Sequence, residues 1–130
     1  MTPLTGHIAI LDDDASLRRA MARLLEAFSI RVQTYGTARE FIDSLSLGAP
    51  ACLIVDLQLE GMTGQELQHY LTGMEIKIPT IILTALDAPG IRERCLKAGA
   101  VDFLVKPVEK DRLLRAITAA VGQNGNLPAS

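Results

Sequence analysis

One stretch, Ile8-Ala-Ile-Leu-Asp-Asp-Asp14, decides the fold, because in it a short apolar run passes directly into carboxylates. Three later apolar runs also end in a polar residue: Cys52–Val55 before Asp56, Thr80–Leu83 before Thr84, and Phe103–Val105 before Lys106. Short apolar runs between helical patterns are typical of buried parallel strands. Open α/β sheets bind ligands at the carboxyl ends of their strands, so we expect these polar residues to converge on one site.

Helical patterns separate the apolar runs. Two helices are expected to begin at capping boxes, in which Thr and Glu side chains bind free backbone N–H groups: Thr37-Ala-Arg-Glu40 and Thr63-Gly-Gln-Glu66. Another helix is predicted over Ile91–Lys97 and is ended by Gly99. Apolar stripes at helical spacing predict the first and last helices. The stripe of the first helix is Leu17, Met21, Leu24, Leu25 and Phe28, and the stripe of the last helix is Leu113, Leu114, Ile117, Ala120 and Val121.

Strand and helix alternate along the whole chain, with Arg31–Tyr35 as the second strand. Right-handed crossovers fold such a chain into an α/β structure, a three-layer αβα sandwich around a five-stranded parallel sheet. Polar and apolar residues alternate in Arg31–Tyr35, which favours an edge strand and the flavodoxin-like strand order 2-1-3-4-5. We expect one domain over residues 1–121 and a linker or disordered tail over residues 122–130.

The composition is typical of one globular domain with a single core, since the 130 residues are 48% hydrophobic and 22% charged. A net charge of −2 without a Lys/Arg cluster argues against a nucleic-acid surface within these residues. Cys52 and Cys95 are expected to be buried thiols of a reducing compartment rather than a disulfide. With no signal-peptide pattern or membrane-length apolar run, we expect a cytoplasmic protein without membrane contact.

Three carboxylates, those of Asp12, Asp13 and Asp56, are expected to lie side by side where the strand order reverses. Such groups repel one another unless a cation lies between them. Mg²⁺ suits an all-oxygen site that leaves positions for water and phosphate oxygens. We expect Asp13 and Asp56 to bind the ion directly and Asp12 to act through water. The backbone carbonyl of Gln58 would complete the protein ligands.

Asp56 is the residue expected to accept a phosphoryl group, because it stands alone at its strand end and Asp carboxylates form acyl phosphates. Lys106 would supply a fixed positive charge opposite the metal, and Thr84 would donate its hydroxyl to a phosphoryl oxygen. The small Ala85 leaves the approach to Asp56 open. Pro107 is expected to follow a cis peptide bond that directs Lys106 inward.

Together these segments resemble the receiver domain of bacterial two-component response regulators, over nearly the whole chain. The matching motifs are Ile8-Ala-Ile-Leu-Asp-Asp-Asp14, Leu53-Ile-Val-Asp56, Ile82-Leu-Thr-Ala85 and Gly99-Ala-Val-Asp-Phe-Leu-Val-Lys-Pro107. The last of them is most similar to receivers that precede a helix-turn-helix output domain. Whether the chain is free-standing or belongs to a longer regulator stays open.

The resemblance implies that a sensor histidine kinase or a phosphotransfer protein donates a phosphoryl group to Asp56 with Mg²⁺. The domain would catalyse only this transfer and the later loss of phosphate, and would otherwise not be an enzyme. The resemblance also implies a switch, in which Thr84 moves toward the phosphoryl group and Phe103 rotates into the vacated space. It further implies that the kinase docks on the first helix, on a surface with Arg18, Arg19, Met21 and Arg23. The phosphorylated form would dimerise through the last helix, with Arg112 and Arg115.

Departures from the family pattern bear on the alternatives. The loop after the phosphoacceptor has Leu59-Glu60 where the family often has Met-Pro. Leu86 cannot orient water, so we expect a longer-lived aspartyl phosphate than in receivers with a polar residue there.

An aspartate-nucleophile phosphatase would need a second Asp where Gln58 stands, which disfavours that class. The main alternative is a pseudo-receiver, a protein-interaction module that works without phosphorylation. Plainer roles also stay open, namely helix capping for Asp14 and core packing for Phe103.

Overall fold

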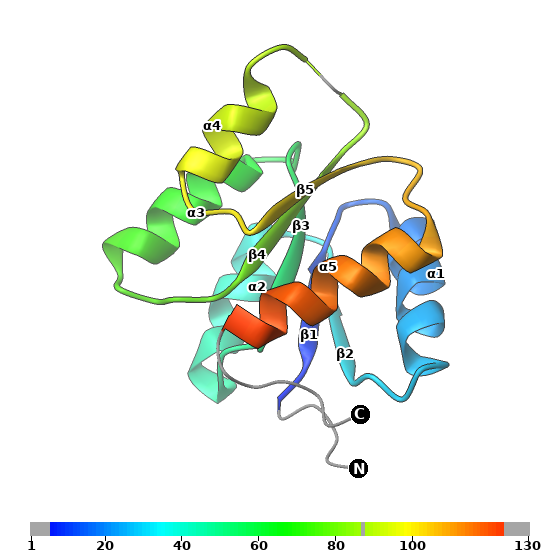
Figure 1. Ribbon diagram of the computed structural model, residues 1–130. Helices are drawn as coiled ribbons and strands as arrows, with labels where there is room; N and C mark the ends of the chain where they lie inside the picture. The colour runs from blue at the N-terminus through cyan, green and yellow to red at the C-terminus, as the bar shows by residue number, and fades with distance from the viewer. Residues whose placement is uncertain (1–5, 87, 124–130) are drawn as a thin grey trace.

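A five-stranded parallel sheet forms the centre of the protein, whose computed structural model describes residues 6–86 and 88–123 (Figure 1). The strands are β1 (Ile8–Leu11), β2 (Val32–Tyr35), β3 (Cys52–Asp56), β4 (Thr80–Thr84) and β5 (Asp102–Val105). Their order across the sheet is β2-β1-β3-β4-β5, and each neighbouring pair is parallel. The predicted strand order and the edge position of β2 are confirmed.

Helices cover both faces of this sheet. They are α1 (Ala15–Glu26), α2 (Ala38–Ser44), α3 (Gly64–Gly73), α4 (Ile91–Lys97) and α5 (Lys110–Gln123), with a 3₁₀ turn at Leu45–Leu47 after α2. In Figure 1, α1 and α5 lie on one face and α2, α3 and α4 on the other, which confirms the three-layer sandwich. Both predicted capping boxes are present, at Thr37 and Thr63. Helix α5 continues to Gln123, so residues 122 and 123 of the expected tail belong to this helix. The rest of that tail, residues 124–130, lies outside the described residues.

The sheet divides the hydrophobic core into two clusters, so the single core expected from composition is wrong in this respect. Alternate residues of β1 point to opposite faces: Ile8 and Ile10 pack with α1 and α5, whereas Ala9 and Leu11 pack with α2 and α3. Because both faces are covered, β1, β3 and β4 are buried at every residue. The fifth strand was expected to be equally buried, but Val105 is 39% exposed because β5 is the other edge of the sheet.

The first helix ends earlier than its apolar stripe predicts. It ends at Glu26, and Phe28 lies beyond it with 50% of its surface exposed. Ser29 adopts the left-handed backbone region, with φ of 63°, and the Ile30 amide donates to the Leu25 carbonyl at 3.1 Å. This bonding pattern is typical of a Schellman-type helix end. The expectation that Phe28 belongs to the buried helical stripe is therefore wrong.

Both cysteines are buried and free, as expected. Burial raises the pKa of the Cys52 thiol to about 12. The thiol therefore stays protonated at neutral pH and packs as a small apolar group. Among the residues that the structure describes, no helix has the length and apolar character needed to cross a bilayer.

An ion pair joins the edge strand β5 to α5. The Arg112 guanidinium donates two hydrogen bonds to the Asp102 carboxylate, each 2.8 Å long. Burial alone would raise the pKa of Asp102. The hydrogen bonds from Arg112 and from the Phe103 amide, together with the charges of Arg112 and Arg92, outweigh burial and lower this pKa. A carboxyl group whose pKa is lowered by folding stabilises the fold only while it is ionised.

We expect Asp102→Asn to lower the free energy of unfolding at neutral pH by about 1 kcal/mol, a modest loss because the pair is partly exposed. The stabilisation is complete above the ordinary pKa of 3.8 and is lost as the pH falls through the lower pKa of the folded state. Urea unfolding at a series of pH values measures this loss, with Glu60→Gln, an exposed carboxyl in the loop after β3, as control. A difference from wild type that is the same at every pH would contradict the ion pair's role.

Candidate functional site

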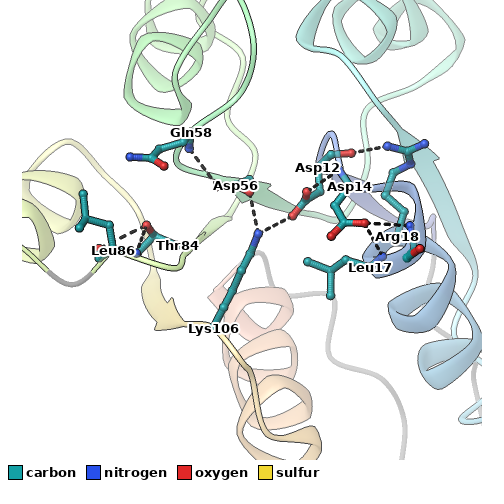
Figure 2. A network of polar contacts seen from close by, with 10 residues as sticks. Asp12, Asp14, Leu17, Arg18, Asp56, Gln58, Thr84, Leu86 and Lys106 are labelled. Atoms are coloured by element: carbon teal, nitrogen blue, oxygen red, sulfur yellow. Dashed lines mark hydrogen bonds and ion pairs between the residues drawn. The ribbon is translucent and has the colours of Figure 1, made fainter.

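The predicted polar residues meet at the carboxyl edge of the sheet. Asp12 directly follows β1, Asp56 ends β3, Thr84 ends β4, and Lys106 directly follows β5. Figure 2 shows the Lys106 side chain extending between Asp12 and Asp56, while Thr84 lies on the far side of Asp56 from Asp12. The strand ends therefore bring together the acids and the lysine that the sequence singled out.

Lys106 binds two of these carboxylates at once. Its Nζ lies 2.9 Å from Asp12 Oδ2 and 2.7 Å from Asp56 Oδ2. Partial burial alone would lower the pKa of Lys106, but hydrogen bonds to Asp56 and Asp12 and the charges of both outweigh burial and raise the pKa. The ammonium group is therefore charged at neutral pH. The Lys106-Pro107 peptide bond is cis, as the sequence predicts.

The turn after β1 fixes Asp12 in its buried position. Asp12 is fully buried, and its Oδ1 accepts a hydrogen bond of 2.9 Å from the Asp14 amide. The Asp14 side chain caps α1, accepting from the amides of Ser16 and Leu17, so the predicted capping role is confirmed. The Arg18 guanidinium donates to the Asp12 backbone carbonyl (Figure 2). No sequence pattern indicates this contact, which gives Arg18 a structural role besides the docking role expected of it.

Three carboxylates make up the acidic cluster at this edge. Asp12, Asp13 and Asp56 each offer one oxygen, and these oxygens lie within 4.8 Å of one another. Asp13 is exposed, whereas Asp12 and Asp56 are buried, so the cluster opens to solvent on the Asp13 side. Carboxylate oxygens with an open side are the donor set that a hard divalent cation such as Mg²⁺ prefers. The residues present therefore fit the metal that the sequence predicts.

The loop after β3 orients Asp56. The Gln58 amide donates to Asp56 Oδ1 at 2.9 Å, and the Gly64 amide donates to the Leu57 carbonyl at 2.8 Å. A Cβ atom at Gly64 would lie 3.1 Å from the Asp56 carbonyl oxygen, so the start of α3 packs closely against the backbone of this residue. Gly61 has φ of 85°, a conformation that glycine adopts without strain. These glycines help to form the turn in a loop that has Leu59-Glu60 and no proline.

The hydroxyl of Thr84 is engaged within its own loop. Thr84 is buried, and its Oγ1 accepts from the Leu86 amide at 2.9 Å and lies 3.2 Å from the Leu86 carbonyl oxygen as a donor (Figure 2). Ala85 between them is exposed. The Leu86 side chain is 50% exposed. An interaction of Thr84 with a phosphoryl group would therefore require its hydroxyl to leave Leu86.

Phe103 is 1% exposed and belongs to the core cluster beneath α3 and α4, so the structure agrees with its packing role.

The docking surface expected on α1 is smaller than predicted. Met21 is 6% exposed and packs in the core as part of the buried stripe of α1. The prediction that Met21 belongs to the docking surface is therefore wrong. Arg19 and Arg23 of α1 are exposed.

Comparison with known proteins gives the family. The sequence model of the response regulator receiver domain matches residues 8–118. The chain belongs to the response regulator receiver family. Nodulation protein W of Bradyrhizobium diazoefficiens is 35% identical over 113 residues, which make up 87% of this chain and 50% of that protein. Transcriptional regulatory protein FixJ of the same organism is 34% identical, with 91% of this chain and 58% of that protein covered.

Solved receiver structures have the same fold. The crystal structure of FixJ-N superposes with a TM-score of 0.83 at 30% identity, covering 90% of this chain and 94% of that chain. A response regulator receiver protein from Burkholderia phymatum gives a TM-score of 0.79 at 39% identity, covering 91% and 96%. The predicted family and fold are therefore confirmed. Receiver domains are signalling domains rather than classical enzymes, and this chain spans about half the length of the curated relatives it matches.

Proposed function

We propose that this receiver accepts a phosphoryl group on Asp56 from the phosphohistidine of a sensor histidine kinase or a phosphotransfer protein. The observation that carries the proposal is the position of Asp56, whose carboxylate is bound by Lys106 and lies beside Asp12 and Asp13. In this proposal the exchange takes place in the cytoplasm, where free thiols such as Cys52 stay reduced.

The chain's own groups define the transfer step. A carboxylate oxygen of Asp56 forms a bond to phosphorus, the phosphorus–nitrogen bond of the donor breaks, and its electron pair leaves with the imidazole. The Gln58 amide and Lys106 hold one carboxylate oxygen each, so the Asp56 side chain is oriented before the donor arrives. Lys106 stays close to the phosphoryl oxygens as a fixed positive charge, and Thr84 donates its hydroxyl to one of them.

The metal site is part of the same proposal. Asp13 and Asp56 would bind Mg²⁺ directly, Asp12 would act through water, and the Gln58 carbonyl would be a further ligand. When bound, the ion neutralises negative charge on the incoming phosphoryl group. Asp12 would also keep its hydrogen bond from Lys106. The metal ion and the Lys106 ammonium group would thus share the acidic cluster.

The output of the proposed switch involves α4, β5 and α5. Phosphorylation would draw Thr84 from Leu86 and let the ring of Phe103, which is already buried, move further into the vacated space, a change in the populations of two arrangements. A homodimer of the phosphorylated form is a further proposal for this face. Arg112 is already bound to Asp102 within the chain, so contacts to a second copy would fall mainly to the exposed Arg115.

Phosphorylation by a small donor tests the proposal directly. We expect acetyl phosphate with Mg²⁺ to add one phosphoryl group to the wild type and none to Asp56→Asn, as measured by intact-protein mass spectrometry. Omission of Mg²⁺ should lower the initial rate of labelling at least about tenfold, which corresponds to about 1.4 kcal/mol of lost transition-state stabilisation. The exposed Asp43→Asn on α2 serves as the control and should be labelled as the wild type is. A folded wild type that takes up no phosphoryl group would contradict the proposal and favour the pseudo-receiver alternative.

Stability measurements test the metal ligands separately from phosphorylation. Mg²⁺ at ten times its dissociation constant should raise the free energy of unfolding of the wild type by about 1.4 kcal/mol, because only the folded state holds the acids together. Asp13→Asn should lose this gain, whereas Asp14→Asn should keep it, since asparagine also caps a helix. Urea unfolding with and without Mg²⁺ gives the values. An equal gain in Asp13→Asn would remove Asp13 from the ligand set.

Leu86 should set the lifetime of the aspartyl phosphate. Its half-exposed side chain has no group that orients an attacking water. We expect the phosphate on the wild type to decay about three- to tenfold more slowly than on Leu86→Asn, a barrier difference of about 1 kcal/mol. The decay is followed by mass spectrometry after removal of the donor, with Leu96→Asn, a partly exposed leucine of α4, as control. Faster decay of the wild type would show that Leu86 does not protect the phosphate.

A further inference from the structure

A guanidinium from the neighbouring helix lies over the ring of Phe103. Arg92, in the first turn of α4, places its Cζ 5.7 Å from the ring centroid. Its Nη1 also donates to the Phe103 backbone carbonyl at 3.3 Å. One side chain therefore contacts both the ring and the backbone of the aromatic residue in β5, and these contacts join α4 to β5.

A surface hollow lies next to Phe103. It has a volume of about 460 Å³ and is lined by residues that include Arg92, Phe103, Val105, Pro107, Val108 and Arg112. Phe103 nevertheless stays 1% exposed. Because Arg92 lies over the ring and also lines the hollow, loss of its guanidinium would open the ring to that space.

We propose that Arg92 is a positioning residue that holds Phe103 in its buried position before a phosphoryl group reaches Asp56. The inference rests on the proposed function and concerns the regulation of the same site. Thr84 is bonded to Leu86 in this structure, whereas Phe103 already points inward. Phosphorylation would thus have to reorient Thr84, while Arg92 has set the position of Phe103 in advance.

The link between the site and Arg92 runs through the start of α4. The loop that carries Thr84 and Leu86 leads into Ile91, the first residue of α4, and Arg92 follows. A movement of that loop would therefore change how firmly Arg92 covers Phe103. An exposed cation–π contact alters the ratio of two populations about two- to fivefold, which is enough to bias the ring without locking it.

Fluorine NMR of protein labelled with para-fluorophenylalanine tests the inference, because the chain has 3 phenylalanines and two serve as internal references. Phe41 is fully buried and Phe28 is half exposed, so they bracket the range of exposure. Line broadening by a soluble gadolinium chelate reports how exposed each ring is. The variants are Arg92→Met, which keeps an unbranched apolar stem but removes the guanidinium, Arg92→Lys, which keeps a cation, and Arg94→Met on the same helix as control. Each is measured before and after acetyl phosphate with Mg²⁺.

In Arg92→Met without phosphorylation, we expect the broadening of the Phe103 signal to rise about two- to fivefold, with Phe41 and Phe28 unchanged. Arg92→Lys should lie closer to the wild type, and Arg94→Met should match it. An unchanged Phe103 signal in Arg92→Met, or an equal rise in Arg94→Met, would overturn the inference. A wild type that takes up no phosphoryl group would instead refute the proposed function, while the comparison of unphosphorylated variants would still decide whether Arg92 holds the ring.

Discussion

Like charges at the carboxyl edge of the sheet are the constraint on which the rest of the structure depends. Parallel strands with the order β2-β1-β3-β4-β5 bring Asp12 and Asp56 together from the adjacent strands β1 and β3. Two buried carboxylates whose oxygens lie within 4.8 Å of each other need a positive charge nearby. Lys106, directly after β5, supplies it with bonds of 2.9 Å to Asp12 and 2.7 Å to Asp56. The fold thus holds the proposed acceptor carboxylate of Asp56 and its counter-charge in one arrangement.

The two sides of the site differ in how firmly they are held. On the acidic side, Asp12 receives hydrogen bonds from Asp14 and Lys106, and its carbonyl receives one from Arg18. On the other side, the described residues give the Thr84 hydroxyl bonds to the loop residue Leu86, a local contact that can be exchanged without unpacking the core. The proposed phosphorylation switch requires this arrangement, in which a firmly held acceptor lies beside an exchangeable hydroxyl.

Much of this could be predicted from the sequence, because strand ends, capping boxes and apolar periodicity are local signals. The positions of Asp56 and Lys106 followed from the runs that precede them. The rest depends on long-range packing: helical spacing does not show that Ser29 ends α1 and leaves Phe28 exposed. In the same way, no periodicity indicates that Arg92 lies over Phe103 or that Arg112 binds Asp102, since these contacts join different elements.

A crystal structure of the chain with Mg²⁺ and beryllium fluoride, a stable mimic of a phosphoryl group, tests most directly whether this site carries a phosphoryl group. We expect a fluoroberyllate bound to an oxygen of Asp56, contacted by Lys106 and by a Thr84 hydroxyl that has left Leu86. Phe103 should remain buried under Arg92. An Asp56 without the fluoroberyllate, with Lys106 still bound to both Asp12 and Asp56 and Thr84 still bound to Leu86, would contradict the claim that this site is built to carry a phosphoryl group.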